Sequence, residues 1–206
     1  MKPICVAAIS LLVLAACDRT NDNAGTGSGN MAVDTVESEN SAAIDTSNAM
    51  AAAPGDTGTT SDPATYVQLA GASDMFEIES SRVVLQKTKN ADVRSFANMM
   101  IDEHTKSTAK LKAAARSQNV AAAAPQLMPG QQRMLDAIRN ADAANIDRVY
   151  LADQRTAHST ALSLHQGFAA APGSGALGKT AGEIAQVVQK HLTALDRLEG
   201  SVVARK

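Results

Sequence analysis

Apolar residues recur every three or four positions in four stretches between residues 62 and 199, and this helical spacing limits the fold more than any other feature. No part of the region shows the alternation of apolar and polar residues that is typical of a half-buried strand. The pattern therefore predicts an all-α domain over residues 62–199, an antiparallel four-helix bundle.

The limits of the expected helices come from capping and breaking signals. Asp62 followed by Pro63 is typical of an N-cap and a first helical residue, and a second helix is expected to begin near Asp92. Gly200 is a candidate stop for the last helix, which leaves residues 200–206 as a C-terminal tail. After the first helix, the expected helical ranges are 92–118, a third region in two pieces at 131–140 and 145–170, and 177–199.

Every histidine of the chain lies on or beside the apolar stripe of an expected helix. Two acidic residues of the first helix, Asp74 and Glu77, lie one turn apart and face the same way as its apolar residues. Buried charged groups are costly unless they pair with one another or bind a metal ion. The polar interior is therefore the candidate functional site. The histidines are His104, His158, His165 and His191.

The first sixteen residues are typical of a bacterial export signal. Lys2 precedes an apolar stretch at residues 4–16 that is too short to span a membrane. Residues 14–17 (LAAC) match the lipobox that lipoprotein signal peptidase cleaves before the cysteine. Acyl chains on Cys17 would anchor the protein, since each buried methylene contributes roughly 0.8 kcal/mol. An ordinary secretory signal cut at an alanine is the alternative.

Cysteine use agrees with export. Cys5 would be removed with the signal and Cys17 acylated, so the mature domain has no disulfide and no thiolate ligand. Any metal must therefore be held by nitrogen and oxygen. Asp18 resembles the inner-membrane retention signal of enteric bacteria, but other bacterial groups do not follow that rule, and the choice of membrane stays open.

The segment at residues 17–61 is expected to be a disordered acidic linker because it has few large apolar residues. Residues 18–62 hold eight acidic residues and one arginine, whereas residues 63–206 hold thirteen acidic and seventeen basic residues. The domain thus carries only about +4, and the chain has two tyrosines, three phenylalanines and no tryptophan. Such a weak charge without aromatic stacking residues argues against nucleic-acid binding.

Four runs of sequence, in order, carry a resemblance to a known family. The runs are 73–81 (SDMFEIESS), 96–106 (FANMMIDEHTK), 147–151 (DRVYL) with Gln154 and His158, and 191–192 (HL). They resemble a ferritin-like family of bacterial envelope proteins, which carries a domain-of-unknown-function label and whose members are often described as predicted outer membrane or exported proteins. The resemblance covers about residues 62–199 and implies a four-helix, ferritin-like bundle without an established activity. The family's usual aspartate–histidine pair in the second helix appears here as Glu103-His104.

A ferritin-like fold invites comparison with di-iron carboxylate proteins, but the spacing does not fit. Such sites need Glu-x-x-His on two helices, so that both ligands reach one metal. None of the four histidines has a carboxylate three residues before it. The residues at those positions are Ile101, Arg155, Leu162 and Val188.

A mononuclear site remains a candidate. Its four ligands would come from four separate helices, and their nitrogen and oxygen atoms suit zinc, iron, manganese or copper(II). The alternative is that these groups pair among themselves and fix the register of the helices. His165 lies at a helix edge and is expected to be a half-exposed core histidine. The candidate ligands are Glu77, His104, His158 and His191, and the candidate residues around them are Asp74, Glu103, Tyr150 and Gln154.

We therefore expect a lipoprotein anchored through Cys17 to the periplasmic face of a bacterial membrane. Its ferritin-like domain would act as a binding or structural module of the cell envelope, with the lipid bilayer and envelope proteins as partners. No catalytic residue is assigned. The alternative is a metal-binding protein or metal-dependent enzyme that uses the four candidate ligands.

Overall fold

The computed structural model describes residues 59–204, with side chains as far as Ser201. The export signal, Cys17, Asp18 and most of the acidic linker expected from the sequence lie outside the described residues. The described part is all-helical and contains no strand, as predicted. No helix in it is long and apolar enough to span a membrane. The five helices are α1 (Pro63–Lys87), α2 (Ala91–Ser117), α3 (Pro129–Asn140), α4 (Ile146–Ala170) and α5 (Gly175–Ala204).

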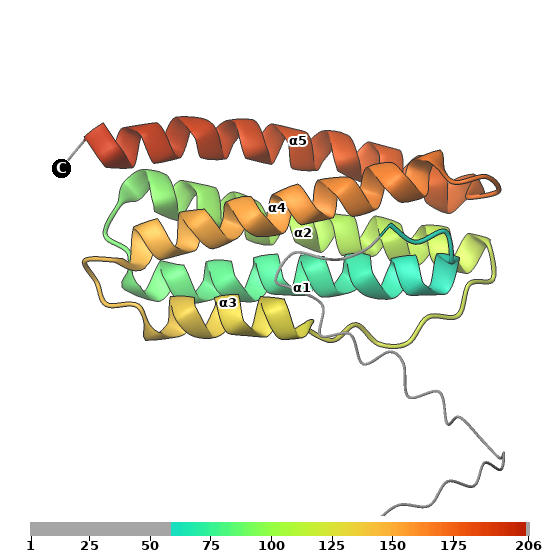
Figure 1. Cartoon of the computed structure of the whole chain (residues 1–206), viewed down its shortest axis with the longest axis horizontal. Coiled ribbons are helices and arrows are strands. Elements are labelled where there is room, and N and C mark those ends of the chain that lie inside the picture. The colour runs from blue at the N-terminus through green and yellow to red at the C-terminus, as the bar shows by residue number, and fades with distance from the viewer. Residues whose placement is uncertain (1–58, 205–206) are drawn as a thin grey trace, which may run out of the picture. The chain divides into compact units, whose positions relative to one another are not determined.

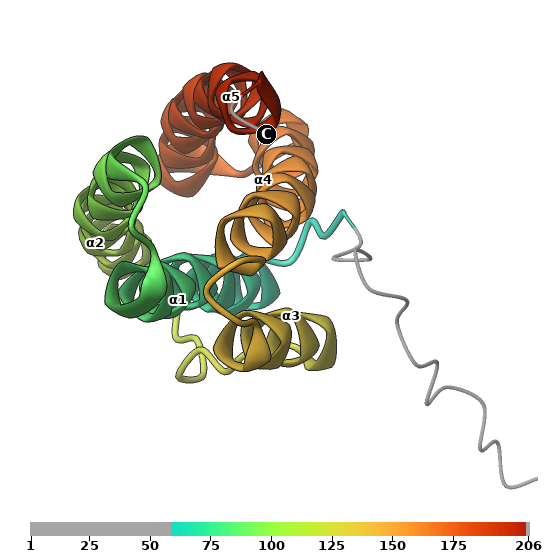
Figure 2. The same ribbon diagram turned by 90° about the vertical axis from the view of Figure 1, so that its left-hand side faces the viewer.

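Four of these helices run side by side along the length of the domain (Figure 1). Viewed end-on, α1, α2, α5 and α4 follow one another around a common interior, and α3 lies outside this ring (Figure 2). The short helix α3 packs against α1 and α4. Lys87, at the end of α1, donates hydrogen bonds to the carbonyls of Arg139 and Ala141 at the end of α3. The two pieces of the expected third region are thus separate helices, of which only α4 lines the interior.

Local signals explain where the helices begin. The Asp62 carboxylate accepts a hydrogen bond from the Thr65 amide at 2.8 Å, which confirms the predicted N-cap. Asn90 caps α2 in the same way by accepting from Asp92 at 3.0 Å, so α2 begins at residue 91. Between α4 and α5, Gly173 and Gly175 adopt φ angles of 77° and 55°, which L side chains rarely adopt.

The predicted end of the last helix is wrong, because α5 continues through Gly200 to Ala204. A glycine ends a helix by adopting a left-handed conformation, and Gly200 does not have a positive φ angle. Instead the Ser201 hydroxyl donates to the Leu198 carbonyl within the continuing helix. Residues 200–204 therefore belong to α5 and not to a tail.

A small apolar cluster of Ala161, Ile184 and Val188 and two large clusters fill the interior, and the two large clusters lie on either side of a polar layer. One contains Phe76, Met100, Tyr150 and Leu195, and the other contains residues of the opposite helix ends. Between these clusters lie buried polar side chains from the middle of α1, α2, α4 and α5, whereas the buried His165 lies near the end of α4 beside Tyr66 of the second cluster. The side chains of the polar layer are Asp74, Glu77, His104, His158 and His191. The second cluster consists of Tyr66, Ala70, Leu111, Ala114, Ala115, Leu164, Phe168, Leu177 and Ala181.

Candidate metal centre

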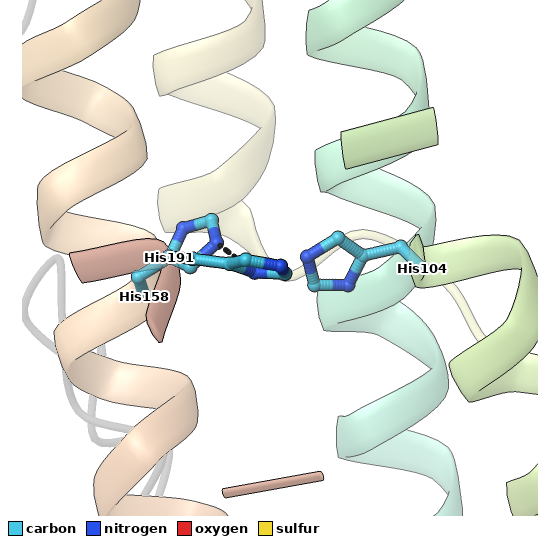
Figure 3. A group of neighbouring side chains, drawn as sticks. All are labelled: His104, His158 and His191. Atoms are coloured by element: carbon cyan, nitrogen blue, oxygen red, sulfur yellow. Dashed lines mark hydrogen bonds between the residues drawn. The ribbon is translucent and has the colours of Figure 1, made fainter. Parts of the chain in front are cut away.

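Three histidines from three helices meet in the polar layer. His104 of α2, His158 of α4 and His191 of α5 are buried, with exposed fractions of 4%, 1% and 2%. Each offers one ring nitrogen, and these nitrogens lie within 4.8 Å of one another. Figure 3 shows the His104 ring facing the other two, which lie together. We call these three residues the histidine cluster.

A buried carboxylate fixes the orientation of His104. Its Nδ1 lies 2.8 Å from Asp74 Oδ1, and the other oxygen of Asp74 accepts a hydrogen bond from the Thr108 hydroxyl at 2.8 Å. Burial alone would lower the pKa of His104, but the hydrogen bond and negative charge of Asp74 outweigh it and raise the pKa. The Nε2 atom of His104 is buried and has no hydrogen-bond partner among the described residues.

The other two histidines are also held by acceptors. His158 Nδ1 lies 2.9 Å from the main-chain carbonyl of Gln154, and His191 Nε2 lies 3.1 Å from Glu103 Oε2. The remaining nitrogens, His158 Nε2 and His191 Nδ1, are 3.1 Å apart. Burial, followed by the nearby imidazoles of His158 and His104, lowers the pKa of His191 to about 4.

These acceptors determine which nitrogens carry hydrogen. A carboxylate or carbonyl oxygen only accepts, so His104 and His158 donate from Nδ1 and His191 donates from Nε2. In the neutral rings, the three other nitrogens then carry lone pairs toward one another. Two nitrogens on a tetrahedral zinc ion with bonds of 2.0–2.1 Å are separated by about 3.3 Å. The 3.1 Å between His158 Nε2 and His191 Nδ1 is close to this separation.

A proton is the competing occupant of this space. A proton between His158 Nε2 and His191 Nδ1 would make His158 an imidazolium, with Glu77 Oε1 lying 3.3 Å from its Nδ1. That arrangement satisfies two histidines but leaves His104 Nε2 buried without a partner. A metal ion among the three nitrogens gives each lone pair a partner.

Glu77 lies beside the histidine cluster and not within its converging nitrogens. Its carboxylate is 1% exposed, and neither oxygen has a hydrogen-bond partner in the described part of the chain. Burial acts to raise the pKa of Glu77, but the charges of His158 and then His104 outweigh it and lower the pKa. A buried carboxylate is costly unless positive charge lies nearby, and the histidines beside Glu77 or a metal ion bound to them would supply that charge.

The residues expected to surround the ligands have different roles. Asp74 and Glu103 contact cluster histidines with their carboxylates, whereas Gln154 does so with its main-chain carbonyl and donates its side-chain amide to Ser80. Tyr150 contacts no cluster histidine and bonds with Ser81 at 2.8 Å.

Two contacts of the polar layer were not predicted from the sequence. Thr108, whose hydroxyl donates a hydrogen bond to Asp74, lies one turn after His104 on the same apolar stripe. This i, i+4 spacing is the sequence signal from which the contact could have been predicted. His165 is buried, not half-exposed, because its Nδ1 bonds with the Tyr66 hydroxyl at 2.9 Å.

The fold and the site define an all-helical protein with a buried cluster of three histidines held by carboxylate and carbonyl acceptors. A family model described as "Domain of unknown function (DUF4142)" matches residues 48–198. The chain belongs to this family, which agrees with the domain-of-unknown-function family indicated by the sequence. No curated protein and no solved structure matches the chain.

Proposed function

We propose that this chain is a metal-binding protein in which His104, His158 and His191 coordinate one divalent transition-metal ion. The observation that carries the proposal is the set of three ring nitrogens within 4.8 Å of one another, each on an imidazole whose other nitrogen lies beside an oxygen acceptor. Such acceptors orient metal-bound histidines and raise their basicity. The ligands lie on long packed helices, so the site is formed before the ion arrives.

The donor set favours metals that prefer imidazole. Neutral imidazoles suit zinc, copper(II), iron and nickel, whereas manganese and calcium prefer oxygen ligands. Among divalent ions we expect copper to bind most tightly, zinc next and manganese most weakly, in the usual order of nitrogen-site affinities.

Glu77 supplies the negative charge that a cation requires in the bundle interior. Its buried carboxylate lies 3.3 Å from the outer nitrogen of His158, where its negative charge offsets the charge of the ion. Loss of such an outer partner typically lowers metal affinity 10- to 100-fold. We expect Glu77→Gln to have an effect of about that size.

The same proposal includes a place in the cell. The lipobox at residues 14–17 and the acidic segment after it support a lipoprotein anchored through Cys17 at the periplasmic face of a membrane. The domain would be a ferritin-like module of the envelope, because α1, α2, α4 and α5 surround a polar layer at mid-length. Its role is binding, with the lipid bilayer and other envelope proteins as partners.

The test uses the full-length chain purified in detergent without a histidine tag. After chelation and dialysis against zinc, we expect about one ion per chain by elemental mass spectrometry and a higher melting temperature. Saturation at one hundred times Kd would stabilise the fold by about 2.7 kcal/mol. His104→Gln should lose both effects.

His165→Gln is the matched control because it removes a buried histidine outside the cluster. It should retain the bound zinc. A wild-type chain that binds no ion and shows no thermal shift with zinc or copper would refute the proposal. Equal loss of metal in both variants would also refute the assignment of the ligands.

A further inference from the structure

A pocket of about 190 Å³ lies between α2 and α5 and reaches the histidine cluster. His104 and His191 both line it, whereas His158 and Glu77 do not. The rest of the wall on the α5 side consists of the apolar residues Ile184, Val187 and Val188 together with Glu183. The cluster is thus closed by α1 and α4 on one side and borders a cavity on the other.

A metal ion on the cluster would keep at least one coordination position free. Three protein ligands and an open fourth position distinguish reactive zinc sites from closed structural sites. The three imidazole ligands are neutral, so the ion remains a Lewis acid that can take an anionic ligand at the open position, while Asp74 and Glu77 offset its charge without occupying that position. Glu77 lies beside His158, away from the lining of the pocket, so the pocket side is left for a ligand from outside.

We propose that a small inorganic anion enters between α2 and α5 and binds the metal at this open position. The inference rests on the proposed metal site and adds the class of its exogenous ligand. The pocket volume of about 190 Å³ is sufficient for an ion of a few atoms.

A polar side chain in the pocket lacks a partner. The Ser107 hydroxyl oxygen is buried, lines the pocket and makes no hydrogen bond among the described residues. It is available to donate to an anion bound at the metal. A buried hydroxyl without a partner is costly, so a ligand that accepts its hydrogen bond is favoured.

Charged residues at the same pocket allow an anion to approach. Lys106 and Lys110 line it, and both form exposed ion pairs, Lys106 with Asp102 at 2.5 Å and Lys110 with Glu183 at 3.7 Å; Glu183 also lines the pocket. Such exposed pairs are weak and open readily to solvent ions. Glu103 also lines the pocket, but its carboxylate is engaged by His191.

The test uses the full-length chain loaded with copper(II), with azide as the probe. Bound copper is first counted by elemental mass spectrometry, so that failure of the metal site is recognised separately. We expect azide to produce a new near-ultraviolet charge-transfer band and a changed electron paramagnetic resonance spectrum. A copper-loaded wild-type chain that shows neither change would overturn the inference while leaving the metal site intact.

Two variants locate the azide. Val187→Phe fills the pocket from α5 and should weaken azide binding at least tenfold while copper stays bound. Val67→Phe enlarges a half-buried valine that lines a different pocket, so it is the matched control and should bind azide normally. Ser107→Ala removes only the free hydroxyl and should weaken azide about two- to tenfold. If Val187→Phe and Ser107→Ala both bind azide as tightly as the wild-type chain does, the assignment of this pocket is overturned. If Val187→Phe fails to fold, an unchanged azide affinity of Ser107→Ala alone overturns it.

Discussion

Asp74→Asn isolates the contribution of the carboxylate that holds His104. In the native chain, Asp74 accepts from His104 Nδ1 and from the Thr108 hydroxyl, both at 2.8 Å, and all three groups are buried or half-buried. Asparagine has nearly the same shape, and its carbonyl oxygen still accepts from His104. Its amide group donates to the Thr108 oxygen in place of accepting. The substitution therefore removes the negative charge with little change in packing.

The expected loss of metal affinity results from removal of the negative charge of Asp74. The Asp74 carboxylate makes His104 more basic and offsets the charge of a metal on Nε2. Removal of such a partner costs about 10- to 100-fold in metal affinity, which corresponds to roughly 1.4–2.7 kcal/mol. The effect should appear as faster metal dissociation, since the route through the pocket is unchanged.

The assay is zinc affinity by competition with a chromophoric chelator at pH 7. Thermal melting of the metal-free variant checks that the fold is retained. Asp102→Asn is the control because it removes an exposed carboxylate two residues from His104 that pairs only with Lys106. Equal zinc affinities of Asp74→Asn and the wild-type chain would refute the assignment of His104 Nε2 as a metal ligand supported by Asp74.

Three further predictions concern the metal-free fold. Burial lowers the pKa of His165 to about 4 from 6.5, so its contribution to stability is full above pH 6.5 and is lost as the pH falls toward 4. In His165→Gln, the free energy of unfolding should fall by up to about 3 kcal/mol less between pH 7 and pH 4 than it does in the wild-type chain. Urea unfolding at the two pH values measures this difference, and the same fall in both chains would contradict the prediction. Burial raises the pKa of Asp153 to about 6 from 3.8, so its ionisation destabilises the fold as the pH rises through 6. Because solvent screens this half-buried group, Asp153→Asn should stabilise the chain by only about 1 kcal/mol at pH 7 and by nothing near pH 3; a loss of stability at pH 7 would refute this. Tyr66→Phe leaves His165 Nδ1 without its partner and should cost about 1–3 kcal/mol in the same assay, and a neutral effect would show that this hydrogen bond does not stabilise the fold.

The elements that could be predicted are those set by local physical chemistry. The cap formed by Asp62 and the start of the second helix near Asp92 depend on a few neighbouring residues. The inward direction of Asp74 and His104 follows from helical periodicity within one helix. The continuation through Gly200 was missed because a glycine ends a helix only where the chain turns, and no local signal forces a turn there.

The geometry of the site depends on the register and rotation of each helix relative to its neighbours. The apolar stripe of one helix does not determine these, so the sequence pattern could not predict which polar groups meet. His158 and His165 lie seven residues apart on α4, about 10 Å along the helix, so one joins the cluster while the other bonds with Tyr66. Likewise, Glu77 faces inward as predicted, but the register of α1 against α4 places it at the outer nitrogen of His158.

X-ray absorption spectroscopy of the zinc-loaded, full-length chain tests the central claim most directly. We predict a first coordination shell containing three imidazole nitrogens at about 2.0–2.1 Å, with the outer-ring scattering that imidazole produces. In His104→Gln the imidazole contribution should fall, or the zinc should be absent. A wild-type chain whose zinc shell contains only oxygen, or whose imidazole count is the same in His104→Gln, would contradict the assignment of the histidine cluster as a metal site.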